Sequence, residues 1–302
     1  MDVLKKLKER KEQDALNRRI VKALIPVRDE AAHKGNFGKI LIAAGSEGMC
    51  GAAVLCAAAA FRTGSGLVRV LVPRYLYPVI QTGIPEATCV DRDAVKEFSE
   101  YDAVAVGPGL GMSEKSADLV ESILKGYAGP LVIDADALNI ISKGGLCSAL
   151  RERAAKYETV ITPHIGEARR LLVDYTEEEL RSMSREMMAE ALVKKTGCIV
   201  LLKGRDTIIA RSIGVIEGEE LVEMVVNTTG NPGMATGGSG DVLTGVIASL
   251  MGQGLSAFDA ARAGAYIHGM AGDMAAEKYG EAGLIAGDIA KYVAFAIKTI
   301  ID

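Results

Sequence analysis

The sequence predicts an α/β fold in which a mainly parallel central sheet carries helices on both faces. Short runs of β-branched residues alternate with longer segments of helical period, and an apolar fraction of 49% in 302 residues can fill one large core. The alternation indicates crossover connections between parallel strands. No repeat or Pro/Gly-rich linker divides the sequence, so we expect residues 1–302 to form a single domain.

Residues 1–30 are predicted to be an N-terminal helical extension of that domain. Basic residues such as Lys5 and Lys8 are mixed with acidic ones such as Glu9, which argues against a transit peptide, and no apolar signal core follows. We expect a solvated helix here, with no membrane or partner role and no chemistry.

Six short runs rich in Val, Ile and Leu predict buried strands. Each has few charges, and most are followed by glycine or polar residues. The segments between them with helical period include 52–62, 114–125 and 177–195. The predicted strands are KILIAAG from Lys39, LVRVLV from Leu67, AVAVG from Ala103, PLVIDAD from Pro130, TVITP from Thr159 and CIVLLKG from Cys198.

The pattern changes in the last third of the chain. Residues 206–210 and 214–226 predict short strands with turns, and the sequence beyond Gly237 predicts mostly helices. Two of these helices, 241–251 and 257–274, are rich in Ala and Gly, which permits close helix packing.

Composition excludes several classes of protein. A net charge of −4 gives no basic face for nucleic acid, and the longest apolar run, 51–61, is too short to span a bilayer. The cysteines lack the clustering of a zinc site or a disulfide framework, so we interpret them as reduced residues of a cytoplasmic protein. They are Cys50, Cys56, Cys89, Cys147 and Cys198.

Glycine and polar residues follow five of the predicted strands. Open parallel sheets bind ligands beyond the carboxyl ends of their strands, so these loops predict a pocket at one edge of the sheet. The five loops are AAGSEGMCGA after the strand at Lys39, GPGLG after Ala103, DADALN after Leu131, TPHIGE after Val160 and KGRDT after Ile199.

A sixth loop, GNPGMATGGSGD, runs from Gly230 to Asp241 and leads into an apolar helix. Glycines let backbone N–H groups point at one place, and a helix N-terminus adds positive partial charge, so the loop suits a phosphate or another anion. Asp241 would lie at the first turn of that helix. It is either a helix cap or a base that takes a proton from a substrate hydroxyl during phosphoryl transfer.

Other motifs are absent from the sequence. No GKS or GKT follows the glycines, so the loop is not a Walker A motif, and GPGLG lacks the spacing of a dinucleotide fingerprint. No Ser-His-Asp, HExxH or Cys-His spacing supports a hydrolase or a metalloenzyme.

The histidines and a few other polar residues leave alternatives open. We favour a ligand contact for His164, whereas His33 is equally a loop residue bonded to backbone, and His268 is a packing residue of its helix. Lys203, at the end of an apolar strand, either meets a diphosphate or extends to solvent. The DADALN residues Asp134, Asp136 and Asn139 could orient substrate or a hydrated Mg²⁺, although Asp136 could equally cap a helix.

Taken in order, these motifs resemble the NAD(P)H-hydrate dehydratase family of the ribokinase-like superfamily, from about Ala32 to the C-terminus. The resemblance implies an enzyme that dehydrates the S form of hydrated NADH or NADPH. It uses ADP, or ATP in some lineages, as co-substrate together with Mg²⁺. The motifs are HKGNFGKILIAAGSEGMCGAA, TGSGLVRVLVP, VGPGLG, VIDADALN, TPHIGEARRLL, VLLKGRDTII, NTTGNPGMATGGSGDVLTGVIASLMGQG and AYIHGMAGD.

The resemblance also implies roles for individual residues. Asp241 would be catalytic, and no residue is assigned as a direct metal ligand. The hydrate site would be lined by Ala52, Gly109, His164 and Asp241, with polar contacts from Asn139 and Asn231. The adenine nucleotide would be held by Lys203, Gly204, Arg205, Asp206, Thr207, Gly238 and Gly240.

Two further expectations concern partners. About thirty residues precede the match, so the resemblance implies no fused epimerase domain and reliance on a separate epimerase or on spontaneous epimerisation. The Ala-rich helix that begins near Ala52 could pack against another subunit, so we expect a homo-oligomer.

Two other functions remain as alternatives. A vitamin-precursor kinase of the same superfamily would use the same Asp and the same loop. A non-catalytic sensor that binds adenine dinucleotides is the other alternative, and the presence of Asp241 beside an apparently intact anion loop argues against it. TPHIGE and KGRDT together with GPGLG favour the dehydratase, and ADP is the preferred co-substrate.

Overall fold

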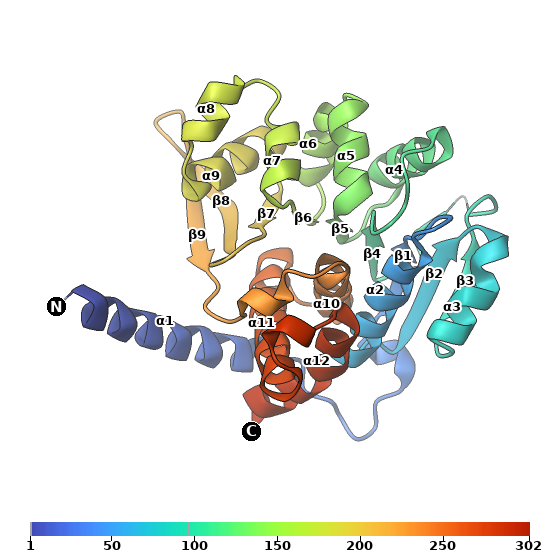
Figure 1. Cartoon of the computed structure of the whole chain (residues 1–302). Coiled ribbons are helices and arrows are strands. Elements are labelled where there is room, and N and C mark those ends of the chain that lie inside the picture. Colours follow the sequence, from blue (N-terminus) through green and yellow to red (C-terminus); the bar gives the residue numbers. More distant parts are fainter. Residues whose placement is uncertain (1, 96) are drawn as a thin grey trace.

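The computed structural model describes residues 2–95 and 97–302, and these share one nine-stranded sheet. The spatial order is β3-β2-β1-β4-β5-β6-β7-β8-β9 (Figure 1). The first seven strands are parallel, and β8 and β9 join antiparallel to β7. The strands are β1 Lys39–Ala43, β2 Leu67–Val72, β3 Thr88–Asp91, β4 Ala103–Val106, β5 Leu131–Ile133, β6 Thr159–Ile161, β7 Ile199–Leu202, β8 Ile208–Ile216 and β9 Glu219–Val226.

Helices cover both faces of the sheet, as the sequence predicts (Figure 1). Successive residues of a strand point to opposite faces. In β1, Ile40 and Ile42 belong to one apolar core, and Leu41 and Ala43 to the other. The first core is closed by α2 Cys50–Thr63, α10 Ser239–Gly252, α11 Ala257–Tyr279 and α12 Ala286–Ile301, and the second by α4 Glu114–Gly126, α5 Ala135–Lys143, α6 Cys147–Ala154, α7 Ile165–Leu171, α8 Glu177–Ser182 and α9 Arg185–Thr196.

The strand order changes direction at β1, because β2 and β3 lie on one side of it and β4 to β7 on the other. Such a switch point leaves a crevice beyond the carboxyl ends of the two central strands. The loops after β1 and β4 meet there: Gly45 donates its N–H to the Pro108 carbonyl at 2.8 Å, and the Ser46 hydroxyl donates to the Gly109 carbonyl at 2.9 Å.

Three local predictions were wrong. The predicted helix 177–195 is two helices, because Met183 has an extended backbone conformation and the Ser184 side-chain oxygen caps the start of α9. The short strands at 206–210 and 214–226 are one long hairpin that turns at Glu217 and Gly218, both with positive φ. The edge strand β3 and the helix before it, α3 Tyr77–Gly83, were not predicted, since neither has a long apolar pattern.

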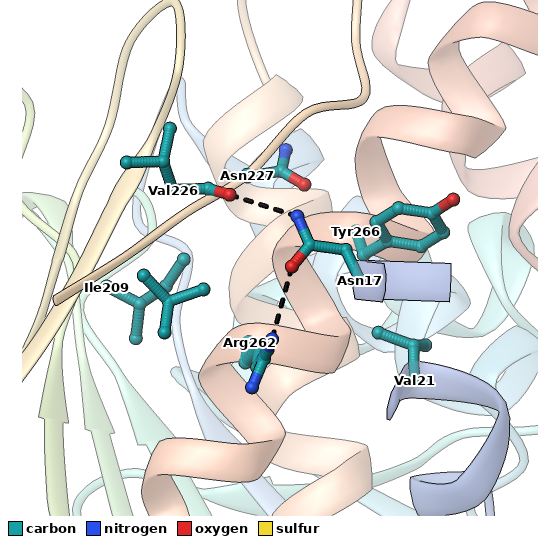
Figure 2. Close-up of a pocket in the computed structure, with 8 residues that line it drawn as sticks. Asn17, Val21, Ile209, Val226, Asn227, Arg262 and Tyr266 are labelled. Atoms are coloured by element: carbon teal, nitrogen blue, oxygen red, sulfur yellow. Dashed lines mark hydrogen bonds between the residues drawn. The ribbon is translucent and has the colours of Figure 1, made fainter. Parts of the chain in front are cut away.

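Helix α1, Asp2–Leu24, is the predicted N-terminal extension, and Figure 1 shows its N-terminal end projecting from the body. Its second half is not the expected solvated helix. Val21 is fully buried, and Asn17 is 3% exposed. The Asn17 amide donates to the Val226 carbonyl at 3.0 Å and accepts from Arg262 at 3.1 Å (Figure 2). Asn17 therefore ties α1 to the end of β9 and to α11.

The remaining global predictions can be compared directly. The five cysteines are free thiols, and Cys50, Cys56 and Cys198 are buried. Across the described part of the chain, every helix is either too short or too polar to cross a bilayer.

Candidate functional site

The predicted hydrate residues Ala52 and Gly109 lie together at the switch point. Gly109 has a φ of +56°, and a Cβ added there would lie 2.7 Å from the Met49 carbonyl oxygen and 2.9 Å from the Ala52 Cβ. A side chain at this position would collide with the start of α2, so only glycine allows the approach. The two residues leave backbone, rather than large side chains, at the mouth of the crevice.

The loops after β5, β6 and β7 bring a lysine between two carboxylates. Lys203 Nζ lies 2.6 Å from Asp134 Oδ1 and 3.7 Å from Glu167 Oε2. The Lys203 side chain is 19% exposed, and Asp134 is buried. Burial by itself lowers the pKa of Lys203, but attraction to Asp134 and Glu167 leaves that pKa above its usual value. Lys203 is therefore a charged, fixed ammonium group rather than a lysine extended into solvent.

The Gly-rich loop, residues 230–241, ends against this ion pair. Gly238 precedes α10 in the left-handed conformation, with a φ of +90°. A Cβ added at Gly240 would lie 3.3 Å from Lys203 Nζ. One turn into α10, the Thr244 hydroxyl donates to Asp134 Oδ2 at 2.8 Å. The N-terminus of α10, where backbone N–H groups are free, therefore lies beside a fixed cation, a combination suited to phosphate.

Asp241 occupies the first turn of α10, as predicted. Burial raises its pKa to about 7, the Asp134 carboxylate adds to the rise, Lys203 opposes it, and Asp136 contributes least. A side-chain cap of the helix would favour the ionised form, but no capping bond from a side chain is present at this N-terminus. A carboxyl group that titrates near neutral pH can accept a proton and release it again. Between the two roles left open by the sequence, the geometry favours the base.

The three histidines behave differently from one another. His164 caps α7: its Nδ1 accepts from Gly166 N at 2.9 Å, and Glu167 Oε2 accepts from His164 N at 2.8 Å. The His164 side chain is 53% exposed, so it can both cap the helix and face a ligand. His33 accepts from Gly35 N at 3.1 Å, the backbone role that the sequence left open. His268 is buried, with Nε2 3.4 Å from the Ser239 hydroxyl, and burial lowers its pKa to about 4.

The asparagines predicted to contact the hydrate have structural partners. Asn139 accepts from Arg170 Nε at 2.8 Å, which joins α5 to α7. Asn231 accepts from Gly233 N at 3.0 Å and donates to Asp273 Oδ1 at 2.9 Å. Asp136 accepts from Gly111 N at 2.8 Å, so it holds the loop after β4 rather than capping its own helix.

The KGRDT loop, residues 203–207, has an ordered backbone. Arg185 donates to the carbonyls of Leu202, Arg205 and Asp206, and the Thr207 hydroxyl donates to the Gly204 carbonyl at 2.8 Å. The side chains of Arg205 and Asp206 point elsewhere: Arg205 is 89% exposed, and Asp206 pairs with Arg10 of α1 at 2.9 Å. The loop can therefore offer its backbone and Lys203 to a nucleotide.

A cavity of about 570 Å³ lies away from these residues, at the C-terminal ends of α1, α10 and α12. It is lined by Ile25, Leu250 and Ile297 among others, and contains none of the predicted site residues. The candidate site is the open edge of the sheet, where loops present backbone and charge to solvent.

Comparison with known proteins matches this geometry to a family. Residues 40–294 match the family model described as NAD(P)H-hydrate dehydratase. The chain belongs to the NAD(P)H-hydrate dehydratase family. The match covers every strand of the sheet except the first residue of β1, and it includes the Gly-rich loop.

Individual relatives in the family agree. An ADP-dependent (S)-NAD(P)H-hydrate dehydratase of Neisseria meningitidis is 39% identical, covering 87% of this chain and 86% of the relative. A bifunctional NAD(P)H-hydrate repair enzyme of Moorella thermoacetica is 38% identical over 94% of this chain but only 54% of its own length. The chain spans about half the length of such bifunctional relatives.

A solved structure confirms the fold. The ADP/ATP-dependent NAD(P)H-hydrate dehydratase of Bacillus subtilis, co-crystallised with ATP and Mg²⁺, superposes with a TM-score of 0.77 at 28% identity, covering 93% of this chain and 96% of that one. The ribokinase-like α/β fold predicted from the sequence is therefore confirmed for this member of the family.

Sequence reasoning missed several residues of the site. Thr244 and Glu167 complete the surroundings of Asp134 and Lys203, and Asp273 holds Asn231. A signal existed for Thr244, because it lies three residues after Asp241 and so on the same side of a helix. Asp273 lies 32 residues beyond Asp241, and no spacing links the two in sequence.

Proposed function

We propose that this chain is an ADP-dependent dehydratase that acts on the S form of hydrated NADH or NADPH, a hydro-lyase that repairs the reduced cofactor. One observation carries the proposal: a carboxyl group with a pKa of about 7, Asp241, lies in the first turn of a helix beside the Lys203–Asp134 ion pair. A base and a phosphate cradle in one place are what a phosphorylation of a hydroxyl group requires.

The proposed reaction has two steps, a phosphorylation and an elimination. Asp241 removes the proton of the ring hydroxyl, and the hydroxyl oxygen attacks the terminal phosphorus of ADP, so that the bond to the leaving AMP breaks. Loss of inorganic phosphate from the ring carbon, together with a proton from the adjacent carbon, then restores the double bond of the nicotinamide. Lys203 and the amides at the start of α10 neutralise charge on the phosphoryl oxygens.

The proposed binding roles are those expected from the family. Ala52, Gly109 and His164 would line the hydrate pocket with Asp241, and Asn139 and Asn231 would support it. The nucleotide would contact residues 203–207 through Lys203 and the backbone of Gly204, Arg205, Asp206 and Thr207. It would also contact the loop glycines Gly238 and Gly240.

Magnesium fits the charges at this site. The carboxylates of Asp134 and Glu167 lie against the ammonium of Lys203, and the carboxyl group of Asp241 is nearby, so the phosphates of a nucleotide would meet negative charge as well as the Lys203 cation. Within the described residues, no group of three or more His, Cys, Asp or Glu side chains has the geometry of a metal cage. Mg²⁺ keeps most of its waters, so we propose that it would arrive with the nucleotide. Asp134 and Glu167 are 1% and 5% exposed and already bonded, so they would act on the ion through their charge and not as ligands. When bound it would shield charge between the phosphoryl oxygens.

Three further features belong to the proposal. We expect a cytoplasmic location, where reduced nicotinamide cofactors and adenine nucleotides are used. We expect a homo-oligomer, and we expect an NAD(P)H-hydrate epimerase to supply the S form. The names of the bifunctional relatives describe hydrate repair by a longer protein, which supports that last expectation.

The proposal is tested by replacing Asp241 with Asn and following the recovery of reduced nicotinamide absorbance after ADP is added to hydrated NADH. We expect turnover to fall by a factor of about 10² to 10⁴, the usual contribution of a positioned base. ADP binding should persist, because Lys203 and the loop amides are unchanged. Unchanged turnover, or a stable phosphorylated alcohol as the product of the wild-type chain, would overturn the proposal.

A further inference from the structure

The Gly-rich loop has to hold its amides in one arrangement, yet its sequence gives it little rigidity. Five of the twelve residues from Gly230 to Asp241 are glycine. Glycine loses more backbone freedom on ordering than any other residue, so contacts from outside the loop must hold it. Those contacts come from α11, which contains the AYIHGMAGD motif.

Asp273 of α11 binds the first two residues of the loop. Its Oδ2 accepts from Gly230 N at 2.8 Å, and its Oδ1 accepts from the Asn231 side-chain amide at 2.9 Å. Asn231 in turn accepts from Gly233 N at 3.0 Å. The Asp273 carboxylate therefore fixes the N–H of Gly230, a residue with positive φ. Through Asn231 it also fixes the short helical turn Pro232–Met234.

Other residues of α11 hold the loop at further points. The Thr229 hydroxyl donates to the Tyr266 carbonyl at 2.9 Å, and His268 lies 3.4 Å from the Ser239 hydroxyl at the far end of the loop. At Gly272 an added Cβ would lie 2.3 Å from the Met234 sulfur atom, so the loop packs directly on the helix. Asp273 is the one charged side chain in this set.

A carboxylate is the group that this geometry requires. Both donors, an amide N–H of the backbone and an NH₂ group of Asn231, need an acceptor, and only a side chain with two acceptor oxygens satisfies both. An asparagine at the same position would turn one acceptor into a donor that faces another donor. The negative charge of Asp273 also lies against the loop that the proposed function assigns to an anion. This placement has an electrostatic cost that packing alone does not explain.

We propose that Asp273 is a positioning residue of this site: it sets the conformation of the Gly-rich loop and thereby the affinity for the nucleotide, without touching the substrate. The proposal rests on the proposed nucleotide role of the loop. Without the Asp273 contacts, the loop would adopt the conformation that binds ADP only part of the time. The apparent affinity for ADP would then fall in proportion to that fraction. The loop ends in the helix turn that carries Asp241.

The test uses Asp273→Asn, with Glu277→Gln as the matched control. Glu277 is an exposed carboxylate one turn further along the same helix, so the control makes the same change of charge and shape without loop contacts. We expect the KM for ADP to rise about tenfold in Asp273→Asn, the scale of a lost hydrogen bond to a charged group. We expect kcat and the KM for the hydrate to change less than about threefold.

A second readout does not depend on turnover. Amide hydrogen exchange of residues 230–241 should speed up in Asp273→Asn without ADP, while exchange in β1 and β4 stays the same. Adding Asn231→Asp to Asp273→Asn restores a donor and acceptor pair between the two side chains, and exchange of the loop should slow again. Wild-type exchange and wild-type ADP affinity in Asp273→Asn would overturn the proposal.

The outcomes separate this proposal from the proposed function. If the wild-type chain neither binds ADP nor converts the hydrate while Asp273→Asn still loosens the loop, the proposed function fails and the structural role of Asp273 stands. If Asp273→Asn does not fold, Asp273→Glu takes its place under the same criteria, because it keeps both oxygens but moves them by one methylene group. A shift of ADP affinity equal to that of Glu277→Gln would contradict the positioning role.

Discussion

At the scale of single residues, the site depends on charges that are removed from water and compensated within a few ångströms. Lys203 lies between Asp134 and Glu167, and Thr244 holds the second oxygen of Asp134. Burial, together with repulsion from Asp134, raises the pKa of Asp241 to about 7, and the attraction of Lys203 offsets only part of the rise. The same surroundings thus give one carboxylate a structural role and leave the other free to exchange a proton.

The raised pKa of Asp241 has a defined effect on stability. The folded chain holds this proton up to about pH 7, whereas an unfolded aspartic acid releases it near its ordinary pKa of 3.8. The folded state therefore binds more protons between these values, and its stability falls as pH rises through that window. We expect Asp241→Asn to raise the melting temperature, with a difference from wild type that grows from pH 4 to pH 7 and then levels off.

The measurement is differential scanning fluorimetry without nucleotide at a series of pH values. The control for a loss of charge is Asp259→Asn, in the first turn of α11. A difference that shrinks as pH rises would mean that burial does not dominate the titration of Asp241.

Lys203 provides a second prediction at this scale. Lys203→Met removes the cation from a buried ion pair and leaves Asp134 and Glu167 without it. We expect a loss of about 3 to 5 kcal/mol in the free energy of unfolding, as for other buried pairs in which one partner is removed. Urea denaturation measures the loss.

Lys115→Met is the matched control, because Lys115 pairs with Asp93 at 3.2 Å but is 76% exposed. Exposed pairs contribute about 0 to 1 kcal/mol. Equal losses in the two variants would show that the Lys203 pair is solvated and that the compact arrangement of charges does not persist in solution.

At the scale of elements, α1 and α11 form hydrogen bonds and ion pairs with segments that are distant from them in the sequence. Asn17 joins α1 to β9 and α11, and Arg10 pairs with Asp206 in the KGRDT loop at 2.9 Å. Arg10 also donates to the Thr228 carbonyl at 3.2 Å, just before the Gly-rich loop. An extension whose sequence predicts only a solvated helix therefore contacts the KGRDT loop and the segment just before the Gly-rich loop.

Asn17→Ala tests this attachment. The change leaves the Val226 carbonyl and Arg262 without their partner in a closed interface, so we expect a loss of about 1 to 3 kcal/mol in the free energy of unfolding. Urea denaturation monitored by far-UV circular dichroism measures it. Arg19→Ala, an exposed change two residues further along α1, should cost much less. If both variants behave alike, α1 is not held by Asn17.

The predicted elements differ in how well sequence alone placed them. Buried strands such as β1 and β7 have continuous apolar patterns that are local and strong, so they were predicted nearly to the residue. The edge strand β3 has no such pattern, because its four residues are exposed or only half-buried. The break between α8 and α9 depends on the extended backbone of Met183 and the cap at Ser184, which helical periodicity does not reveal.

At the scale of the whole molecule, nucleotide binding should couple to folding stability. A ligand that binds only the native state at 100 times its Kd adds about 2.7 kcal/mol to the free energy of unfolding. We therefore expect saturating ADP with Mg²⁺ to raise the melting temperature by several degrees, and Asp241→Asn to keep most of that shift. Adenosine, which lacks phosphates, is the control. An equal rise in melting temperature with adenosine would mean that the affinity comes from contacts to the adenosine part of the nucleotide, and not from contacts of the phosphates with the loop and Lys203.

The sequence by itself determined the parallel sheet, the set of loops at the carboxyl ends of its strands, and the anion loop that ends in Asp241, because each depends on residues that are close together in the chain. Only the tertiary structure decided that Lys203 pairs with Asp134, that Asp273 holds the Gly-rich loop, and that α1 is attached through Asn17. These contacts join residues from 43 to 209 positions apart. The pKa of Asp241 likewise depends on burial, which is a property of the folded chain and leaves no pattern in the sequence.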